Sequence, residues 1–422
     1  MFEYDDTYEN NVKLGLLNLD MRDDISLTTI DTLNSAFKFE TKYLKYYNDA
    51  FYYHGNLYFL AWNKDSQLCL CTTNPDGQII RLICNLPMYE GGNGKCSFVA
   101  NPHLYGVILA NLKVGDKKIR TYISLNNGKH FMPLEFIENN PDCGDYSCGV
   151  ELDLICSSDS IHIHFPENGI VRFQGTYFKK DFSHRYNFIS FNGGKNFKMI
   201  DTSIEKLVVW NRGGFIFGTE RGNGKIWYSH DEAYSWYRIK IAATKFMELI
   251  PLEHSKNLVV VTINYDETKK TYSLLIFDFS KIFKKSCKTY DYEDWYLPRF
   301  HMNCFQGQEV VYMKKKPSSI CYDDRRSFLP ITEPCPCFIS DFHCKPNYYL
   351  KENFCILERL SNVNESFKRC PIGTKPLIKW NGFTQLDSDV CAPRKNNIYG
   401  NFEDYDYCFQ IIILNEYNFS NC

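Results

Sequence analysis

Short runs of apolar, aromatic and β-branched residues, separated by polar turn residues, fill the first 286 positions of this chain. RTYIS, YNFIS and KIWYS are examples of such runs, and Gly and Asn-Gly recur between them. Branched and aromatic side chains suit the pleated surface of a strand, and Gly and Asn adopt the conformations that tight turns need. Residues 1–286 are therefore expected to be almost all β, as short antiparallel strands joined by turns.

A polar turn pattern, S-x-[DN]-x-[GA]-x-x-[FW], occurs three times, each time between two strand-like runs. The copies are Ser124-Leu-Asn126-Asn-Gly128-Lys-His-Phe131, Ser190-Phe-Asn192-Gly-Gly194-Lys-Asn-Phe197 and Ser229-His-Asp231-Glu-Ala233-Tyr-Ser-Trp236. We expect the Asn or Asp side chain to accept hydrogen bonds from the turn backbone, and the aromatic ring to pack back on the strand. The three turns are expected to superpose.

Turns of one type at intervals of tens of residues predict a β-propeller with one such hairpin per blade. The first two Ser positions lie 66 residues apart and the next two 39 apart, so one blade carries a long insertion. A fourth, degenerate copy is Thr72-Thr-Asn74-Pro-Asp76-Gly77. The pattern resembles the Asp-box of sialidase-like propellers, in which it is structural and remote from any catalytic centre.

Ten of the 18 cysteines lie between Cys287 and Cys408. A stretch this short, interrupted by Pro and charged residues, cannot build a large apolar core, so the density predicts a module stapled by disulfides. Disulfides of this kind persist in an oxidising compartment, which places the chain in the secretory pathway or outside the cell. Two glycosylation sequons are usable there, Asn364-Glu-Ser366 and Asn418-Phe-Ser420.

The N-terminal sequence and the net charge limit what kind of protein this chain belongs to and which partners it binds. The start, MFEYDDTYENNVK, is acidic and lacks the apolar segment of a signal peptide, and the sequence holds no run of eighteen apolar residues. A disulfide-rich chain without a signal sequence is expected to be a piece of a longer protein. The net charge of -2 gives no electrostatic reason to expect a nucleic acid or an anionic membrane surface as a partner.

Five segments of the second half carry a family resemblance. They are Cys287-Lys-Thr-Tyr-Asp291-Tyr292-Glu-Asp-Trp295, Ser318-Ser319-Ile-Cys321, Cys335-Pro-Cys337, Asp341-Phe342-His-Cys344-Lys-Pro-Asn-Tyr348-Tyr349, and Asn381-Gly382-Phe383 ahead of Cys391. With ten cysteines in register, they resemble the sortilin family of vacuolar-protein-sorting type receptors. The first half is similar to that family less specifically, through its turns and through the strand-like run that ends at Phe279.

The resemblance implies a ten-bladed propeller followed by a ten-cysteine module. Residues 1–286 are then the C-terminal part of the propeller, about four to five blades. Residues 287–410 are the module, with subdomains at about 287–338 and 339–410, and residues 411–422 are a tail. Sequence alone cannot choose among the possible pairings of ten cysteines. The bridges that the resemblance implies are Cys287–Cys321, Cys304–Cys335, Cys337–Cys391, Cys344–Cys355 and Cys370–Cys408, with a blade-loop bridge Cys143–Cys148.

Two departures from the family pattern stand out. The family's final Asp-box can hold a cysteine where this chain has Ser235, and roughly half of the propeller is missing; both fit a chain that begins within the propeller. Spacing makes a loop bridge between Cys84 and Cys96 plausible. The cysteines without an assigned family counterpart are Cys69, Cys71, Cys84, Cys96, Cys156 and Cys422.

Metal chemistry has three candidates, and each has a plainer explanation. His162 and His164 in Ile-His-Ile-His would share one face of a strand, as zinc or copper ligands do, but no third ligand is placed nearby. The cysteine spacings lack the paired knuckles of a zinc module, so disulfides explain the cysteines better. The acidic clusters lack the spacing of calcium loops, so solvated loops explain these clusters better. We therefore expect no metal and no other cofactor. The acidic clusters are Asp291/Glu293/Asp294 and Glu403/Asp404/Asp406.

Enzyme activity must also be considered, because Asp-box propellers include sialidases and other glycoside hydrolases. Such an enzyme needs an arginine triad, a nucleophile and an acid at the centre, and no such constellation is present. The arginines near strands are expected to form surface ion pairs. They are Arg172, Arg185, Arg212 and Arg221.

The resemblance implies a receptor ectodomain that binds peptides or proteins in the Golgi and endosomal system for sorting. Family ligands bind inside the propeller tunnel, through strand edges and loops that accept an extended peptide. No ligand-binding residue can be carried over, and membrane attachment would need a segment absent from this sequence. The alternative is a secreted or surface binding or adhesion protein on the same fold, without a sorting role; a sialidase-like hydrolase ranks below both.

Overall fold

The computed structural model describes residues 51–335 with short gaps, and six short segments beyond them. The gaps are 64–65, 74–78, 90–93, 116–117, 137–147, 157, 180–181, 221, 242, 244, 255–256, 300–302 and 325–328. The six segments are 341–344, 348–351, 354–357, 374–376, 383–384 and 408–410.

Two four-stranded antiparallel sheets open the described chain. The first has the order β1-β2-β3-β4 and the second the order β5-β6-β7-β8. Their strands are β1 (Phe51–Tyr53), β2 (Asn56–Trp62), β3 (Leu68–Thr73), β4 (Ile79–Ile83), β5 (Phe98–Ala100), β6 (Ile108–Val114), β7 (Lys118–Ser124) and β8 (Met132–Pro133).

Three further sheets follow in chain order. The third has five strands, ordered β10-β11-β12-β13-β9, because β9 joins β13 in parallel; the fourth is β14-β15-β16-β17, and the fifth is β18-β19-β20. Their strands are β9 (Glu135–Phe136), β10 (Cys148–Leu152), β11 (Val171–Lys179), β12 (Phe182–Ser190), β13 (Asn196–Ile200), β14 (Ile204–Trp210), β15 (Phe215–Glu220), β16 (Lys225–Ser229), β17 (Tyr237–Lys240), β18 (Lys245–His254), β19 (Asn257–Asp266) and β20 (Thr271–Asp278).

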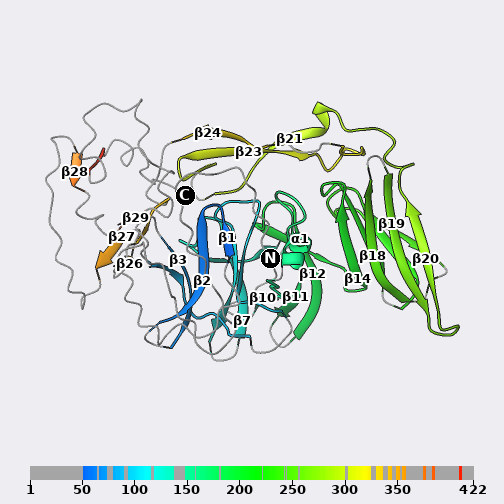
Figure 1. The fold of residues 1–422 in the computed structure, drawn as a ribbon, viewed down its shortest axis with the longest axis horizontal. Coiled ribbons are helices and arrows are strands. Elements are labelled where there is room, and N and C mark those ends of the chain that lie inside the picture. The colour runs from blue at the N-terminus through cyan, green and yellow to red at the C-terminus, as the bar shows by residue number, and fades with distance from the viewer. Residues whose placement is uncertain are drawn as a thin grey trace, which may run out of the picture.

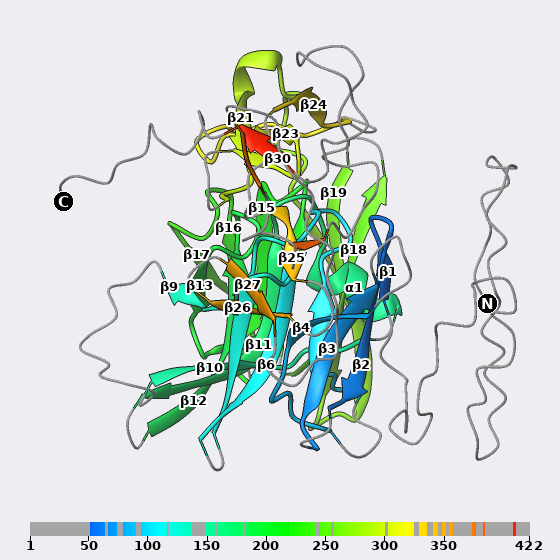
Figure 2. The same cartoon turned by 90° about the vertical axis from the view of Figure 1, so that its left-hand side faces the viewer.

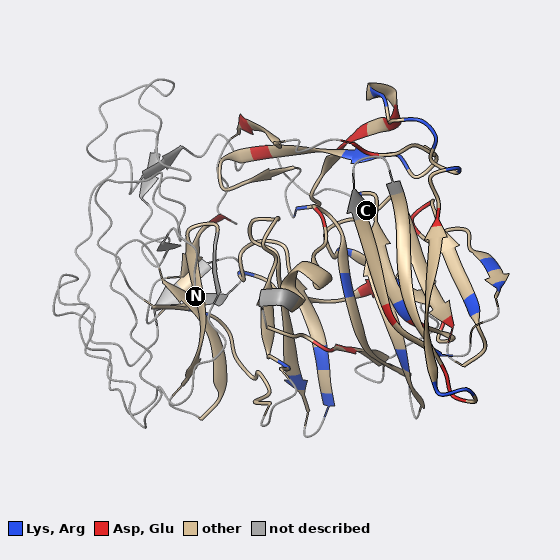
Figure 3. Ribbon diagram, turned by 45° about the vertical axis from the view of Figure 1, so that its right-hand side comes forward, with Lys and Arg blue, Asp and Glu red and all other residues tan. Residues whose placement is uncertain are grey.

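Apolar side chains pack between neighbouring sheets, as between the blades of a propeller. One cluster joins the first three sheets and includes Tyr58, Phe98 and Phe188. A second joins the third and fourth sheets, and a third joins the fourth and fifth. The sheets follow one another across the molecule (Figure 1), and Lys and Arg are interspersed with Asp and Glu along them (Figure 3). The fold is all-β: a partial β-propeller followed by a disulfide-rich module.

The three repeated turns share one set of hydrogen bonds, as the repeat predicts. The hydroxyl of Ser124 accepts from the N–H of Gly128 at 2.8 Å, and Ser190 and Ser229 accept likewise from the residue four positions on, at 2.9 and 3.1 Å. The Asn or Asp two positions after each Ser accepts from a backbone N–H four positions further on, at 2.9, 3.0 and 2.9 Å. The degenerate copy lies between the paired strands β3 and β4, and residues 74–78 of it fall outside the described residues.

The expectation that Ile-His-Ile-His forms a strand is wrong. Ser158–His164 form the helix α1. Ile161 and Phe165, one turn apart, are 3% and 1% exposed, whereas Ile163 between them is 55% exposed. Burial therefore follows the helical period, and the alternation of Ile and His does not indicate a sheet face.

The module begins with a sheet that lies across one end of the propeller sheets, seen at the top of Figures 1 and 2. It contains η2 (Thr289–Asp291), β21 (Tyr292–Tyr296), β22 (Cys304–Phe305), β23 (Gln308–Lys315) and β24 (Ile331–Pro334). Three two-stranded pairs follow, β25 with β29, β26 with β27, and β28 with β30. Their bounds are β25 (His343–Cys344), β26 (Tyr348–Lys351), β27 (Phe354–Leu357), β28 (Thr374–Pro376), β29 (Phe383–Thr384) and β30 (Cys408–Gln410).

Candidate functional site

The module is anchored to the propeller loops by side chains that reach backbone groups. The Arg299 guanidinium, stacked over Phe305 at 4.1 Å, donates to the carbonyl oxygens of Leu125 and Tyr105, the second at 2.7 Å. His343 Nε2 lies 2.9 Å from the carbonyl oxygen of Asn127. Two of these propeller residues, Leu125 and Asn127, belong to the first Asp-box turn. The first Asp-box turn is therefore a docking site for the module.

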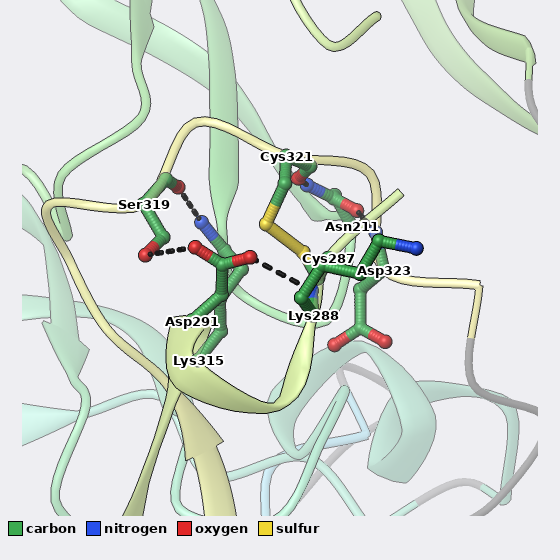
Figure 4. The surroundings of a disulfide bond; sticks show 8 residues. All are labelled: Asn211, Cys287, Lys288, Asp291, Lys315, Ser319, Cys321 and Asp323. Atoms are coloured by element: carbon green, nitrogen blue, oxygen red, sulfur yellow. Dashed lines mark hydrogen bonds between the residues drawn. A yellow bond between two sulfur atoms is a disulfide. The ribbon is translucent and has the colours of Figure 1, made fainter. Parts of the chain in front are cut away.

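A second anchor surrounds the Cys287–Cys321 disulfide, which Figure 4 shows in detail. The Asn211 amide donates to the carbonyl oxygen of Cys321 at 3.0 Å and accepts from the N–H of Asp323 at 2.8 Å. Asp291 accepts from the N–H of Lys288 at 2.7 Å and from the hydroxyl of Ser319 at 3.0 Å. The Asp291 carboxylate therefore stabilises a turn beside the Cys287–Cys321 disulfide.

The other acidic residues considered for calcium do not form a site with Asp291. Glu293 and Asp294 are exposed on strand β21, where a loop was expected. The second acidic cluster, Glu403, Asp404 and Asp406, lies outside the described residues. No group of three or more His, Cys, Asp or Glu side chains in the described part of the chain is placed to hold a metal ion.

Three of the five bridges that the family resemblance implies are present: Cys287–Cys321, Cys304–Cys335 and Cys344–Cys355. Cys148 is also disulfide-bonded. The other cysteines of the implied pairs, and both sequons, lie where side chains are not described. They are Cys143, Cys337, Cys370, Cys391, Cys408, Asn364 and Asn418.

The expected bridge between Cys84 and Cys96 is wrong. Cys84 pairs with Cys69, and Cys96 pairs with Cys156. The antiparallel register of β3 and β4 brings Cys69 opposite Cys84, with Cα atoms 3.9 Å apart. A backbone hydrogen bond from Cys96 to Leu154 places Cys96 beside Cys156. Cys71 is a buried free thiol, and burial raises its pKa to about 12.

A concave pocket of about 860 Å³ lies where α1 and the third, fourth and fifth sheets meet. Figure 1 places α1 and β12 next to β14. β14 and β18 are the terminal strands of their sheets in the described structure, so each presents an unpaired backbone edge. The pocket is lined by His162, Ile163, Pro166, Arg172, Gln174, Arg185, Tyr186, Asn187, Thr202, Ile204, Glu205, Lys206, Leu207, Val208, Val209, Glu248, Leu249 and Pro251.

A smaller cavity of about 380 Å³ adjoins this pocket and shares Ile163, Arg172, Gln174 and Arg185 with it. Within it, the Asp153 carboxylate pairs with Lys95 at 2.6 Å and with Arg185. We call this smaller cavity the basic cavity. It contains three fixed cations, on Lys95, Arg172 and Arg185, and one carboxylate.

The four arginines expected to form surface ion pairs behave differently from one another. Arg185 pairs with Asp153, and Arg212 pairs with Glu167 at 3.4 Å. Arg221 lies outside the described residues. Arg172 contradicts the expectation: it is half-buried in the basic cavity, no hydrogen bond or ion pair joins its guanidinium to another described residue, and desolvation lowers its pKa to about 10. Arg172 lies on β11 beside α1. A strand was expected in place of α1, so the sequence could not predict this position.

His162 and His164 are not brought together as metal ligands. Because they are two residues apart on α1, they point to different sides of the helix. His164 Nδ1 lies 3.0 Å from the carbonyl oxygen of Arg172, and its ring stacks on Phe173. Burial lowers the pKa of His164 to about 4, so the ring is neutral. His162 lines the larger pocket.

Residues 250–404 match the family model described as "Sortilin, neurotensin receptor 3, C-terminal". Over 311 residues the chain is 26% identical to "VPS10 domain-containing receptor SorCS3" of Homo sapiens, a match that covers 68% of this chain and 25% of the receptor. Residues 250–404 of this chain are therefore similar to the C-terminal region of sortilin-type receptors. "Vacuolar protein sorting/targeting protein 10" of Blastomyces gilchristii is 24% identical over 320 residues, covering 69% of this chain and 21% of that protein.

The chain thus spans about a quarter of the length of the relatives it matches. One of these relatives is a VPS10 domain-containing receptor, and the other is a vacuolar protein sorting/targeting protein. In the described part of the chain, no helix is long and apolar enough to cross a membrane.

Similarity to solved structures is low. The Niastella koreensis GH74 enzyme matches with a TM-score of 0.27 at 12% identity, covering 53% of this chain and 34% of that chain. A chain of the nidogen/laminin complex matches with a TM-score of 0.23 at 12% identity, covering 53% of this chain and 75% of that chain. Neither likeness supports a conclusion about activity.

Proposed function

We propose that this chain is a ligand-binding part of the lumenal or extracellular portion of a sorting receptor, and that its ligands are peptides or proteins carried between compartments. The observation that carries the proposal is the sequence match to VPS10-type receptors on a chain whose sheets enclose a large concave pocket. The bridges between described cysteines agree with a Golgi, endosomal or cell-surface location.

The pocket suits an extended peptide. The unpaired edges of β14 and β18 offer backbone N–H and C=O groups, which an extended segment can pair with as an added strand. Apolar side chains such as Leu207 and Leu249 lie beside charged ones such as Glu248 in the pocket wall. Such a mixture suits alternate side chains of a bound strand, which point to opposite faces.

The division of the chain belongs to the same proposal. Residues 1–286 form the C-terminal part of a propeller, residues 287–410 form the ten-cysteine module, and residues 411–422 form a tail. One face of the fifth sheet supports the first part of this division, that residues 1–286 are only part of a propeller, because Tyr272, Leu274 and Ile276 on β20 are 69%, 68% and 69% exposed. Burying these side chains requires another sheet, which we assign to a further blade of the longer protein.

Binding of displayed peptides tests the function. The full chain, secreted from a eukaryotic host and immobilised, should enrich peptides from a random library and bind them in solution. Glu248→Trp should weaken the binding because Glu248 is an exposed residue of the pocket wall, and the indole would fill the pocket. Lys240→Trp is the matched control. Lys240 is exposed on β17, the edge strand of the fourth sheet opposite to β14, which we call its outer strand. Failure to enrich any peptide, or equal loss in both variants, would contradict the proposal.

A further inference from the structure

The segment that joins the propeller to the module carries a local excess of positive charge. Residues 279–288, which we call the joining segment, lead from β20 to η2 at the edge of the fifth sheet (Figure 1). They contain four lysines and no acidic residue, although the chain as a whole has a net charge of -2. All four side chains are exposed: Lys281, Lys284, Lys285 and Lys288.

The backbone of the joining segment is held in place at both ends. Phe283 is 4% exposed and lies in the apolar cluster between the fourth and fifth sheets. The carbonyl oxygen of Lys285 accepts from the N–H of Tyr322 at 2.8 Å, and Cys287 forms a disulfide with Cys321. The lysines therefore extend from a fixed backbone, so a ligand that binds them does not have to order a loop.

The acidic residues that flank the joining segment do not pair with its last three lysines. Lys281 lies near Asp278, which offsets its charge. The Asp291 carboxylate accepts from the N–H of Lys288 and from the hydroxyl of Ser319, so it stabilises the turn at η2. Among the described residues, no ion pair joins the last three lysines to a carboxylate. We call these three residues the lysine cluster: Lys284, Lys285 and Lys288.

We propose that the lysine cluster binds a linear sulfated polysaccharide. Its three cations lie within at most about 14 Å of backbone, a spacing that matches an extended polymer with closely spaced negative charges better than a single small anion. Short Lys-rich segments of this kind are typical of heparin-binding surfaces. Tyr290, two residues after Lys288, is 74% exposed and offers an amphipathic ring on which a sugar can pack.

The compartment decides between this polymer and other polyanions. The described disulfides indicate the lumenal or extracellular side of the membrane, where sulfated polysaccharides occur and nucleic acids do not. Polybasic segments that bind anionic lipids act on the cytoplasmic leaflet, which is the opposite side. The lysine cluster is also separate from the larger pocket, because none of its residues lines that pocket. It is therefore a second binding surface, and it does not depend on the proposed peptide binding.

Three probes, titrated at about 0.15 M salt and at higher salt, test the proposal. They are a heparin decasaccharide, a hyaluronan decasaccharide, which carries carboxylates but no sulfate, and vesicles that contain phosphatidylserine. Each is added to the full chain and to two triple variants that remove the same charge. The cluster variant is Lys284→Gln/Lys285→Gln/Lys288→Gln. The control variant changes exposed lysines of β6, β7 and β17: Lys113→Gln/Lys118→Gln/Lys240→Gln.

We expect the heparin decasaccharide to bind the wild type about tenfold or more tightly than it binds the cluster variant. The slope of log affinity against log salt should become shallower by about one for each lysine removed. The control variant should bind as the wild type does. Both variants should melt with the wild type, because the replaced side chains are exposed.

The proposal is overturned if heparin does not bind the wild type, if the cluster variant binds it equally well, or if both variants lose the same affinity. Equal affinity for hyaluronan would remove the role of sulfate, and vesicle binding that depends on the cluster, without heparin binding, would assign the surface to a membrane. Library peptides should bind all three proteins alike, so failure of the proposal leaves the proposed function standing.

Discussion

Ser124, Ser190 and Ser229 each accept from a backbone N–H only four positions away. Such local contacts depend only on neighbouring residues, so the turn pattern predicted them correctly. The error about Cys84 and Cys96 has the opposite origin, because disulfide partners depend on strand register and on contacts between sheets. Arg172 could not be recognised for the same reason: whether a guanidinium finds a carboxylate is decided by neighbours from other sheets.

The third turn holds an avoidable backbone cost. Ala233 has a φ of 62°, where the first two turns have Gly128 and Gly194 at 81° and 96°. A left-handed conformation costs a residue with a Cβ on the order of 1–2 kcal/mol. Ala233→Gly should therefore raise the free energy of unfolding by about 0.5–1 kcal/mol, measured by chemical denaturation.

Gly128→Ala is the reciprocal control. A Cβ at Gly128 would lie 2.6 Å from Cδ1 of Leu82, in addition to the unfavourable φ. We expect this substitution to lower the free energy of unfolding by about 1–3 kcal/mol. A destabilising Ala233→Gly together with a neutral Gly128→Ala would show that the two turns are not equivalent.

His343 gives the docked module a dependence on pH. The ring is 5% exposed, and burial, with Lys129 and His130 nearby, lowers its pKa to about 3. The unfolded ring titrates near 6.5, so between these values the unfolded state binds the extra proton. Stability is therefore full above about pH 6.5 and falls as the pH decreases. Lowering the pH to about 5 should cost on the order of 2 kcal/mol, measured by denaturation at both pH values.

His343→Gln keeps a donor for the Asn127 carbonyl but does not titrate. Its stability should change less between neutral and acidic pH than that of the wild type. His164, whose pKa is also lowered, to about 4, remains in the variant, so part of the pH dependence should persist. An unchanged pH dependence in His343→Gln would rule out the contribution of His343.

At the level of elements, most strands were predictable and the exceptions have clear causes. The runs before the three turns form β7, β12 and β16, because β-branched and aromatic residues there pack between sheets. Ser158–His164 became a helix because Ile161 and Phe165, one turn apart, both reach the core. The parallel pairing of β9 with β13 joins segments about sixty residues apart, and no local pattern signals it.

The exposed face of β20 predicts self-association of the isolated chain. Leu274 and Ile276 are 68% and 69% exposed, and the strand lies at the edge of its sheet. Exposed apolar edges pair with other chains. Replacing both residues with Thr should increase the monomer fraction in size-exclusion chromatography with light scattering. Lys240→Thr, also at an exposed edge position, should leave the fraction unchanged. A monodisperse wild-type monomer would contradict the proposed further blade.

For the whole molecule, the sequence predicted a propeller portion followed by a disulfide-rich module, but not how the two meet. Arg299 reaches Leu125 across 174 positions of sequence, and His343 reaches Asn127 across 216. Contacts at such separations follow from the path of the chain in three dimensions. The pocket is equally non-local, since α1, β12, β14 and β18 build it together.

The central claim is that the pocket along the edges of β14 and β18 binds extended ligands. Hydrogen–deuterium exchange with a bound peptide tests this claim most directly. A peptide enriched by the immobilised chain should slow exchange of the edge amides in β14 and β18. Exchange in the outer strand β17 should not change, because that strand lies on the far edge of the fourth sheet. Protection confined to β17 or to the module, with no change in β14 and β18, would contradict the account.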